Sequence, residues 1–339
     1  MNAGNSGNTG VTTSMISLGK RAGARKLAGL AMAAAITIAA PVAAKAEQFV
    51  NVLTGGTSGV YYPLGVALSK IYADNIPDAR TSVQSTKASV ENLNLLQAGR
   101  GEIGFALGDS VGLAWAGDTE AGFKGKLDKL RAIAAIYPNY VQIVASQDSG
   151  IKTLADLKGK RISVGAPRSG TELNARAILG AAGLSYDDLG KVEYLPFGES
   201  VELMKNRQID ATLQSAGLGV ASIRDLATSV PITIVAVPAD VVEKIGDAAY
   251  QATEIPAGTY DGQTEAVPAV AIRNILVTHA EVPDALAHEM AKQMFTHLDT
   301  MVAAHAAAKA ISLDGATKGL PIPLHPGAEA YYREAGVLK

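Results

Sequence analysis

A glycine-rich stretch with hydroxyl side chains, TGGTSGVYYPLG, occupies residues 54–65, between an apolar segment and a segment with helical spacing. Gly55 and Gly56 permit positive φ and close approach of a ligand to the backbone. Thr57 and Ser58 lie where a helix N-cap is expected. Because the first turn of a helix leaves N–H groups unpaired and carries a partial positive charge, this stretch could bind an anion. A tight turn with an ordinary cap explains the same residues equally well.

Searches for catalytic and metal-binding patterns find no candidates. A phosphate-binding loop requires a lysine after its last glycine, and none follows Gly59. The segment from Gly56 to Gly59 is one residue short of the G-x-S-x-G hydrolase motif. There is no cysteine, which excludes thiolate chemistry. The spacing of the histidines does not fit a metal site, and we predict surface positions for them: His279, His288, His297, His305 and His325. We therefore expect no catalytic residue, no metal and no cofactor.

A second stretch, GAPRSGTE at residues 165–172, repeats the arrangement of the first. Ser169, Gly170 and Thr171 follow an apolar segment and open a segment with helical spacing. Two helix N-termini, one from each part of the chain, could therefore converge on one small anion. Arg168 could add a guanidinium that pairs with a carboxylate. The alternative for Arg168 is a solvated loop residue.

Polar residues also follow the next two predicted strands. In QSTKASVEN, residues 84–92, Ser85, Ser89 and Asn92 could contact a polar ligand, although Ser89 could equally be a helix cap. Asp109 and Trp115 follow the third strand; Asp109 is a candidate ligand-binding residue, and Trp115 is expected in the core.

The elements that carry these stretches alternate between strands and helices, which predicts an α/β fold with parallel strands. The first series has strands at 48–53, 80–86 and 103–108 and helices at 60–71 and 89–100. The second has strands at 161–167, 191–197 and 232–237 and helices at 169–183 and 200–207, and in residues 208–216 a helix end runs into a further strand.

Two extended apolar segments, 141–145 and 267–279, could connect the two series. They predict two lobes joined by crossing strands. Lobe 1 is expected at 47–140, with the C-terminal helices of 280–339 returning to it. Lobe 2 is expected at 141–268, and residues 269–279 form a crossing strand of the hinge.

The first 46 residues have the composition of a secretory signal peptide. Four basic residues between Lys20 and Lys26 precede an apolar run, Leu27–Ala40, and Ala44–Ala46 gives an A-x-A cleavage pattern. We therefore expect a periplasmic protein, with an N-terminal anchor as the lesser alternative. Without the five basic residues of this segment, the chain has 25 basic and 32 acidic residues, a net charge of −7. This charge argues against nucleic acid as a partner.

These motifs and others make the chain resemble the TAXI family, the extracytoplasmic solute receptors of TRAP transporters. The resemblance is carried by TGGTSGVYYPLG, PRSGTELNA, AIYPNYVQIVA, DLKGKRISVGAP and IPLHPGAEAYYREAGVLK, and extends from Gln48 to Lys339. It implies a type II periplasmic binding-protein fold, with two α/β lobes that close over a ligand. It also implies delivery of a small anionic solute to membrane permease subunits, rather than catalysis. We expect a monomer.

The resemblance implies that the ligand site is lined by residues 55–61, which include Tyr61, by residues 85–92 and by residues 169–171. Gln214 is added from a stretch in which the family usually has aromatic residues. The sequence departs from the family at two usual glycines, which here are Ala88 and Arg168. Family members are associated with glutamate, glutamine or 2-oxoglutarate, so a carboxylate-bearing ligand is expected. A sensor-adaptor for a membrane histidine kinase and an enzyme built on the same lobes are the alternatives.

Overall fold

A computed structural model describes residues 47–339, and the predicted signal peptide lies outside the described residues. Within 47–339 no helix combines the length and apolar character needed to cross a membrane. Ten strands of this part of the chain form one mixed sheet. The strands are β1 (Gln48–Leu53), β2 (Ala79–Gln84), β3 (Ile103–Leu107), β4 (Leu130–Ser146), β5 (Arg161–Ser163), β6 (Lys191–Glu193), β7 (Ala211–Ala216), β8 (Ile232–Val235), β9 (Tyr250–Ile255) and β10 (Val267–His279).

The strand order is β2-β1-β3-β10-β4-β7-β5-β6, with β8 also paired to β4 and β9 to β10. Strand β1 is parallel to β2 and β3, and β5 is parallel to β6 and β7. The two parallel series predicted from the alternation of strands and helices are therefore present. We call β1–β3 with their helices the first half, and β5–β9 with theirs the second half.

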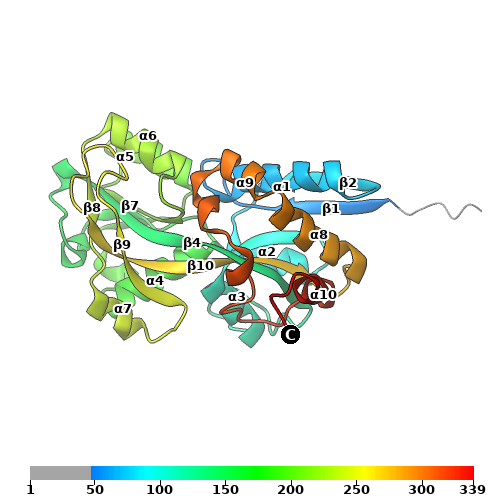
Figure 1. Ribbon diagram of the computed structural model, residues 1–339. Helices are drawn as coiled ribbons and strands as arrows, with labels where there is room; N and C mark the ends of the chain where they lie inside the picture. The colour runs from blue at the N-terminus through cyan, green and yellow to red at the C-terminus, as the bar shows by residue number, and fades with distance from the viewer. Residues whose placement is uncertain (1–46) are drawn as a thin grey trace, which may run out of the picture. The chain divides into compact units, whose positions relative to one another are not determined.

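Two long strands, β4 and β10, belong to both halves (Figure 1). Strand β10 pairs with β9 along Val267–Ile272 and with β3 along Asn274–Val277. Strand β4 pairs with β10 along most of its length and with β7 from Tyr140 onward. Because the sheet is continuous through these strands, the lobe boundaries at 140/141 and 268/269 stay predictions.

Helices cover both faces of the sheet. In the first half, α1 and α8 pack on the face that presents Val52, whereas α2 and α3 pack on the face that presents Leu53. This alternation follows from the two-residue period of a strand. The helices are α1 (Tyr61–Asn75), α2 (Ser89–Gln97), α3 (Gly108–Ala116), α4 (Gly170–Ala181), α5 (Phe197–Lys205), α6 (Ala221–Ser229), α7 (Ala239–Ile245), α8 (Asp284–Thr296), α9 (Leu298–Ala304) and α10 (Pro326–Glu334).

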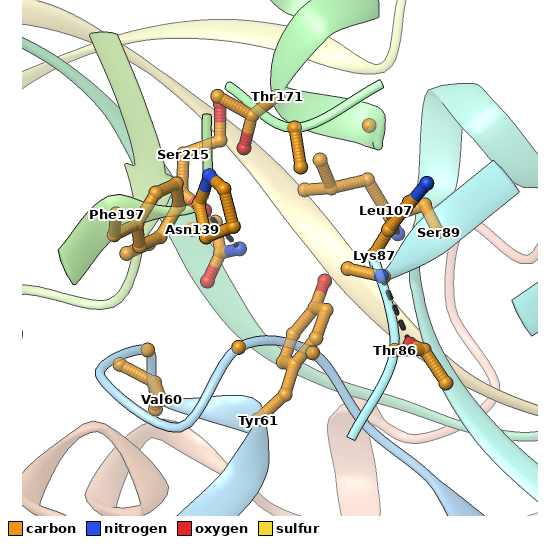
Figure 2. Close-up of a pocket in the computed structure, with 18 residues that line it drawn as sticks. Val60, Tyr61, Thr86, Lys87, Ser89, Leu107, Asn139, Thr171, Phe197 and Ser215 are labelled. Atoms are coloured by element: carbon orange, nitrogen blue, oxygen red, sulfur yellow. Dashed lines mark hydrogen bonds between the residues drawn. The ribbon is translucent and has the colours of Figure 1, made fainter. Parts of the chain in front are cut away.

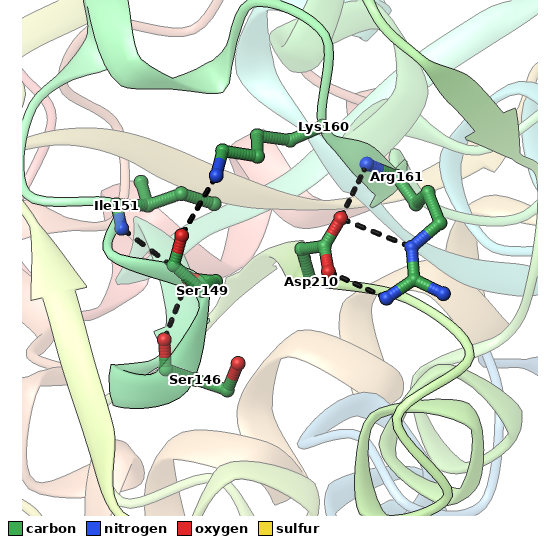
Figure 3. Close-up of polar contacts among 6 residues, drawn as sticks. All are labelled: Ser146, Ser149, Ile151, Lys160, Arg161 and Asp210. Atoms are coloured by element: carbon green, nitrogen blue, oxygen red, sulfur yellow. Dashed lines mark hydrogen bonds and ion pairs between the residues drawn. The ribbon is translucent and has the colours of Figure 1, made fainter.

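An ion pair ties the start of β5 to the start of β7 in the second half (Figure 3). The guanidinium of Arg161 donates to both carboxylate oxygens of Asp210, at 3.1 and 2.6 Å, and the Arg161 backbone N–H donates to the same group. Beside it, Lys160 Nζ donates to the carbonyl of Ser149. The hydrogen bonds from Arg161 lower the pKa of the Asp210 carboxyl. Since the candidate site follows the other end of β5, this pair has a structural role.

Some sequence predictions need correction. The strand predicted over 191–197 ends at Glu193, because Pro196, which has no N–H for strand pairing, precedes helix α5. The histidines are not surface residues as a group, since His279 and His325 are only 6% and 1% exposed. His325 caps α10, with its Nδ1 accepting from the N–H of Gly327. Trp115, expected in the core, is half-buried, with Arg131 over its ring.

Candidate functional site

A pocket lies between the two halves of the sheet (Figure 2). Its walls come from the loops at 55–61 and 86–89 and the end of β3 in the first half, and from 166–171, 196–197 and the end of β7 in the second. Asn139 of β4 contributes from the strand that both halves share. The pocket lies beyond the C-terminal ends of the parallel strands, which is where α/β sheets bind ligands.

The N-terminal ends of five helices from the described chain meet at this pocket. Val60, Ala88, Leu107 and Pro196 are the N-cap residues of α1, α2, α3 and α5, and all four line it. Gly170, the first residue of α4, also lines it. Each helix start presents backbone N–H groups and a partial positive charge. The predicted pair of converging helix starts is therefore part of a larger set.

The glycine-rich loop contributes backbone rather than hydroxyl groups to the pocket. Gly55, Gly56 and Tyr61 line it. Thr57 and Ser58 instead line an adjoining outer groove, and neither caps α1, whose N-cap Val60 has no side-chain hydrogen bond. The reason is that the chain makes an extra turn, closed by the N–H of Gly59 donating to the carbonyl of Gly56, before the helix begins.

Two polar residues after β2 hold the glycine-rich loop in place. Ser85 Oγ donates to the carbonyl of Gly55 at 2.8 Å. Asn92, fully buried, donates through Nδ2 to the carbonyls of Thr54 and Phe105 at 2.7 and 2.9 Å. Neither residue lines the pocket in this structure, although both were expected to contact the ligand.

Ser89 lines the pocket, as expected. It is the first residue of α2, and the N-cap is Ala88, so the alternative role of Ser89 as the cap does not apply. Its Oγ accepts the N–H of Leu107 at 3.1 Å. Because a hydroxyl also carries a donor, Ser89 retains a proton that it can give to a ligand.

In the second half, Thr171 lines the pocket and Ser169 supports it from behind. Ser169 is the N-cap of α4 and accepts the N–H of Glu172 at 3.2 Å. Arg168 is exposed and does not line the pocket; its carbonyl accepts the N–H of Glu91 from α2 at 3.2 Å. A contact between the Arg168 guanidinium and a ligand stays a prediction.

Gln214 and Asp109 lie behind the pocket wall. Gln214 is fully buried, and its Oε1 accepts from Ser222 Oγ at 2.6 Å. Asp109, 3% exposed, accepts from Asn174 Nδ2 at 2.7 Å. Ser215, which lines the pocket, donates to Asn174 Oδ1 at 2.6 Å. Asp109 therefore reaches the pocket only through a chain of hydrogen bonds.

The floor of the pocket is a second hydrogen-bonded chain. Tyr61 Oη donates to Asn274 Oδ1 at 2.5 Å, and Asn274 Nδ2 donates to Asn139 Oδ1 at 2.9 Å. Asn139 Nδ2 donates in turn to the carbonyl of Ser215 at 3.0 Å. Burial raises the pKa of the Tyr61 hydroxyl, which therefore stays protonated. The floor is thus neutral and already paired.

Sequence reasoning did not single out Lys87, which lies within the predicted range 85–92, and it missed Asn139, Phe197 and Ser215 among the residues that line the pocket. Lys87 has a detectable signal, because it lies in the polar stretch that follows β2. The glycine-rich loop lacks a lysine of its own, but the loop at 86–89 places one beside it. The Lys87 side chain is exposed and makes no ion pair with any residue of 47–339. The other three residues carry no sequence signal of their own.

The two halves approach each other closely beside the pocket. A Cβ on Gly59 would lie 3.7 Å from Phe197, and one on Gly170 would lie only 2.7 Å from both Leu107 Cδ1 and Ser89 Oγ. The enclosed space measures about 80 Å³.

Comparison with known sequences decides the family. The sequence model of the NMT1-like family matches residues 52–336. The chain belongs to the NMT1-like family. Among solved structures, this NMT1-like protein is similar to the alkanesulfonate-binding protein SsuA from Xanthomonas axonopodis pv. citri bound to MOPS. The TM-score is 0.50 at 17% identity, over 80% of this chain and 87% of that one.

It is also similar to PhnD1 from Prochlorococcus marinus (MIT 9301) in complex with methylphosphonate, with a TM-score of 0.54 at 11% identity. The similarity covers 86% of this chain and 100% of the PhnD1 chain. These likenesses confirm the predicted fold class, the α/β fold of two-lobed periplasmic solute-binding proteins.

Proposed function

We propose that this NMT1-like protein is a periplasmic solute receptor that binds a small carboxylate-bearing anion in the pocket between its halves. The observation that carries the proposal is the convergence of five helix N-termini on one pocket, with the ammonium of Lys87 at its rim. Partial positive charges and free N–H groups stabilise an anion there. Two structurally similar proteins are named for, or bound to, a sulfonate and a phosphonate, which also are small anions.

Binding is tested with the chain from Glu47 onward and a set of carboxylates, sulfonates and phosphonates, by thermal shift and titration calorimetry. A ligand at 100 times its Kd adds about 2.7 kcal/mol to the free energy of unfolding. Lys87→Gln should lower the affinity for the anion at least about tenfold, because a hydrogen bond to a charged group contributes about 1.5–3 kcal/mol. Lys152→Gln, at an exposed lysine away from the pocket, is the matched control. Binding of neutral or cationic solutes only would contradict the proposal.

The resemblance to TAXI receptors supports delivery to a TRAP-type transporter after export through the segment 1–46. Co-purification of the tagged receptor from its native membrane tests this step. Recovery of a permease with many membrane spans is expected. Recovery of a histidine kinase ectodomain instead would assign the sensor-adaptor role, and a chain that retains residues 1–46 would contradict cleavage.

A further inference from the structure

The charges that line the pocket limit the class of solute. Among the described residues that line the pocket, Lys87 has the one charged side chain, and no Asp or Glu lines the pocket. Carboxylates in the first turns of α4 and α2 are engaged elsewhere: Glu172 with Arg176 at 2.6 Å, and Glu91 with the backbone N–H of Lys87 at 2.7 Å. Asp109 is held by Asn174 and Tyr250. One anionic group therefore has an oppositely charged side chain here, whereas an ammonium group has none.

The pocket also has a direction. Lys87 and Ser89 lie on one side of the view in Figure 2, and Phe197 and Val60 lie on the other. The first turns of α2 and α4 meet at the Lys87 side, because a Cβ on Gly170 would lie 2.7 Å from Ser89 Oγ. This side offers the ammonium of Lys87, the hydroxyl of Ser89 and the backbone N–H groups of two helix starts.

Within the described chain, the opposite side has no charged side chain. It carries the apolar side chains of Phe197 and Val60, beside the starts of α5 and α1. In the floor, the hydroxyls of Tyr61 and Ser215 donate to protein acceptors, and Asn139 donates one of its two amide N–H groups to the carbonyl of Ser215, so a second anionic group would meet no charged side chain there. A charged group buried without a partner is strongly disfavoured.

We infer that the solute is a small monocarboxylate with an apolar body, rather than a dicarboxylate or an amino acid. This inference rests on the proposed carboxylate-receptor function. The carboxylate lies against Lys87, Ser89 and the start of α4, and the apolar body lies against Phe197 and Val60. The space in the pocket, about 80 Å³, is smaller than the cavity of ~150 Å³ that admits benzene, so we expect a body of only a few carbon atoms.

Three ligands with the same four-carbon chain test the inference: butyrate, succinate and 2-aminobutyrate. Titration calorimetry should show binding of butyrate, with succinate and 2-aminobutyrate weaker by at least about 100-fold, because each buries a second charge with no oppositely charged side chain beside it. Binding of succinate or 2-aminobutyrate as tight as that of butyrate would overturn the inference and leave the carboxylate-receptor function standing. Failure of all three, while a sulfonate or phosphonate binds, would overturn both.

A pair of variants tests the direction of binding. Phe197→Arg places a cation at the apolar side and should raise the ratio of succinate to butyrate affinity at least about tenfold. Phe197→Leu keeps that side apolar and should leave the ratio unchanged. Because Phe197 is half-buried at the first position of α5, both variants are checked for folding by circular dichroism. An unchanged ratio in folded Phe197→Arg would overturn the assignment of the apolar side.

Discussion

The carboxylate of Asp109, at the start of α3 in the first half, accepts a hydrogen bond of 2.7 Å from the hydroxyl of Tyr250, in β9 of the second half. Asn174 of α4 donates to the same carboxylate oxygen. The contact joins the two halves behind the pocket, and it buries a group that can ionise.

Burial raises the pKa of Asp109 to about 6, although the hydrogen bonds from Tyr250 and Asn174 oppose this shift. The folded pKa then lies above the unfolded value of about 3.9. Stability from this group is fully present below about pH 4 and is lost as the pH rises through about 6. The free energy of unfolding of the wild type, relative to Asp109→Asn, should fall by up to ~3 kcal/mol between pH 4 and 7. Urea unfolding at several pH values measures it; a constant difference would contradict the raised pKa.

Gly170 allows the halves to close around the pocket. In Gly170→Ala the new Cβ would meet Leu107 Cδ1 and Ser89 Oγ at 2.7 Å and Ser110 Oγ at 2.9 Å. Because this contact would force the halves apart, affinity for the solute should fall at least about tenfold. Titration calorimetry measures this change.

Gly180→Ala is the matched control, since it lies in the same helix with no atom within 4 Å of its added Cβ. It should keep full affinity and raise the free energy of unfolding by about 0.5–1 kcal/mol. Equal affinity of the Gly170→Ala and Gly180→Ala variants would show that the close contact between the halves at Gly170 does not control binding.

Arg168 has a backbone φ of +62°, in the left-handed region that favours glycine. Arg168→Gly should therefore raise the free energy of unfolding by ~1 kcal/mol, whereas Arg168→Ala should leave it nearly unchanged, because alanine meets the same steric cost. The Ala variant removes the guanidinium without relieving this strain, and its affinity for a carboxylate ligand should be at least about tenfold lower. Wild-type affinity in Arg168→Ala would make this residue a solvated loop arginine.

His325 caps α10 in its neutral form, with Nδ1 accepting from Gly327 and Nε2 donating to the carbonyl of Val282. Burial lowers its pKa, so below the unfolded value of about 6.5 the unfolded chain binds the proton more tightly than the folded one. The contribution of His325 to stability should therefore fall as the pH drops below about 6.5, opposite in sign to that of Asp109. Asn also accepts at an N-cap but does not titrate. The loss of stability between pH 7 and 5 should be smaller in His325→Asn, and an equal loss would assign it to other groups.

The sequence alone determined the order and type of the main elements. Strand β1 and strand β10 occupy the predicted segments 48–53 and 267–279, because their side chains alternate or stay apolar over the right lengths. The sequence also placed Ser89, Gly170 and Thr171 at the pocket, because each lies at a strand-to-helix junction. A polar or glycine residue at a strand-to-helix junction lies at the ligand-binding edge of an α/β sheet.

Only the tertiary structure decided which of the junction residues line the pocket. Ser85, Asn92, Asp109 and Gln214 have suitable side chains, but their hydrogen bonds go to neighbouring protein groups. Asn139 and Phe197 line the pocket because strand β4 and helix α5 approach it from distant parts of the sequence. Sequence patterns report local periodicity and local turn chemistry. Long-range packing determines where a side chain of suitable chemistry points.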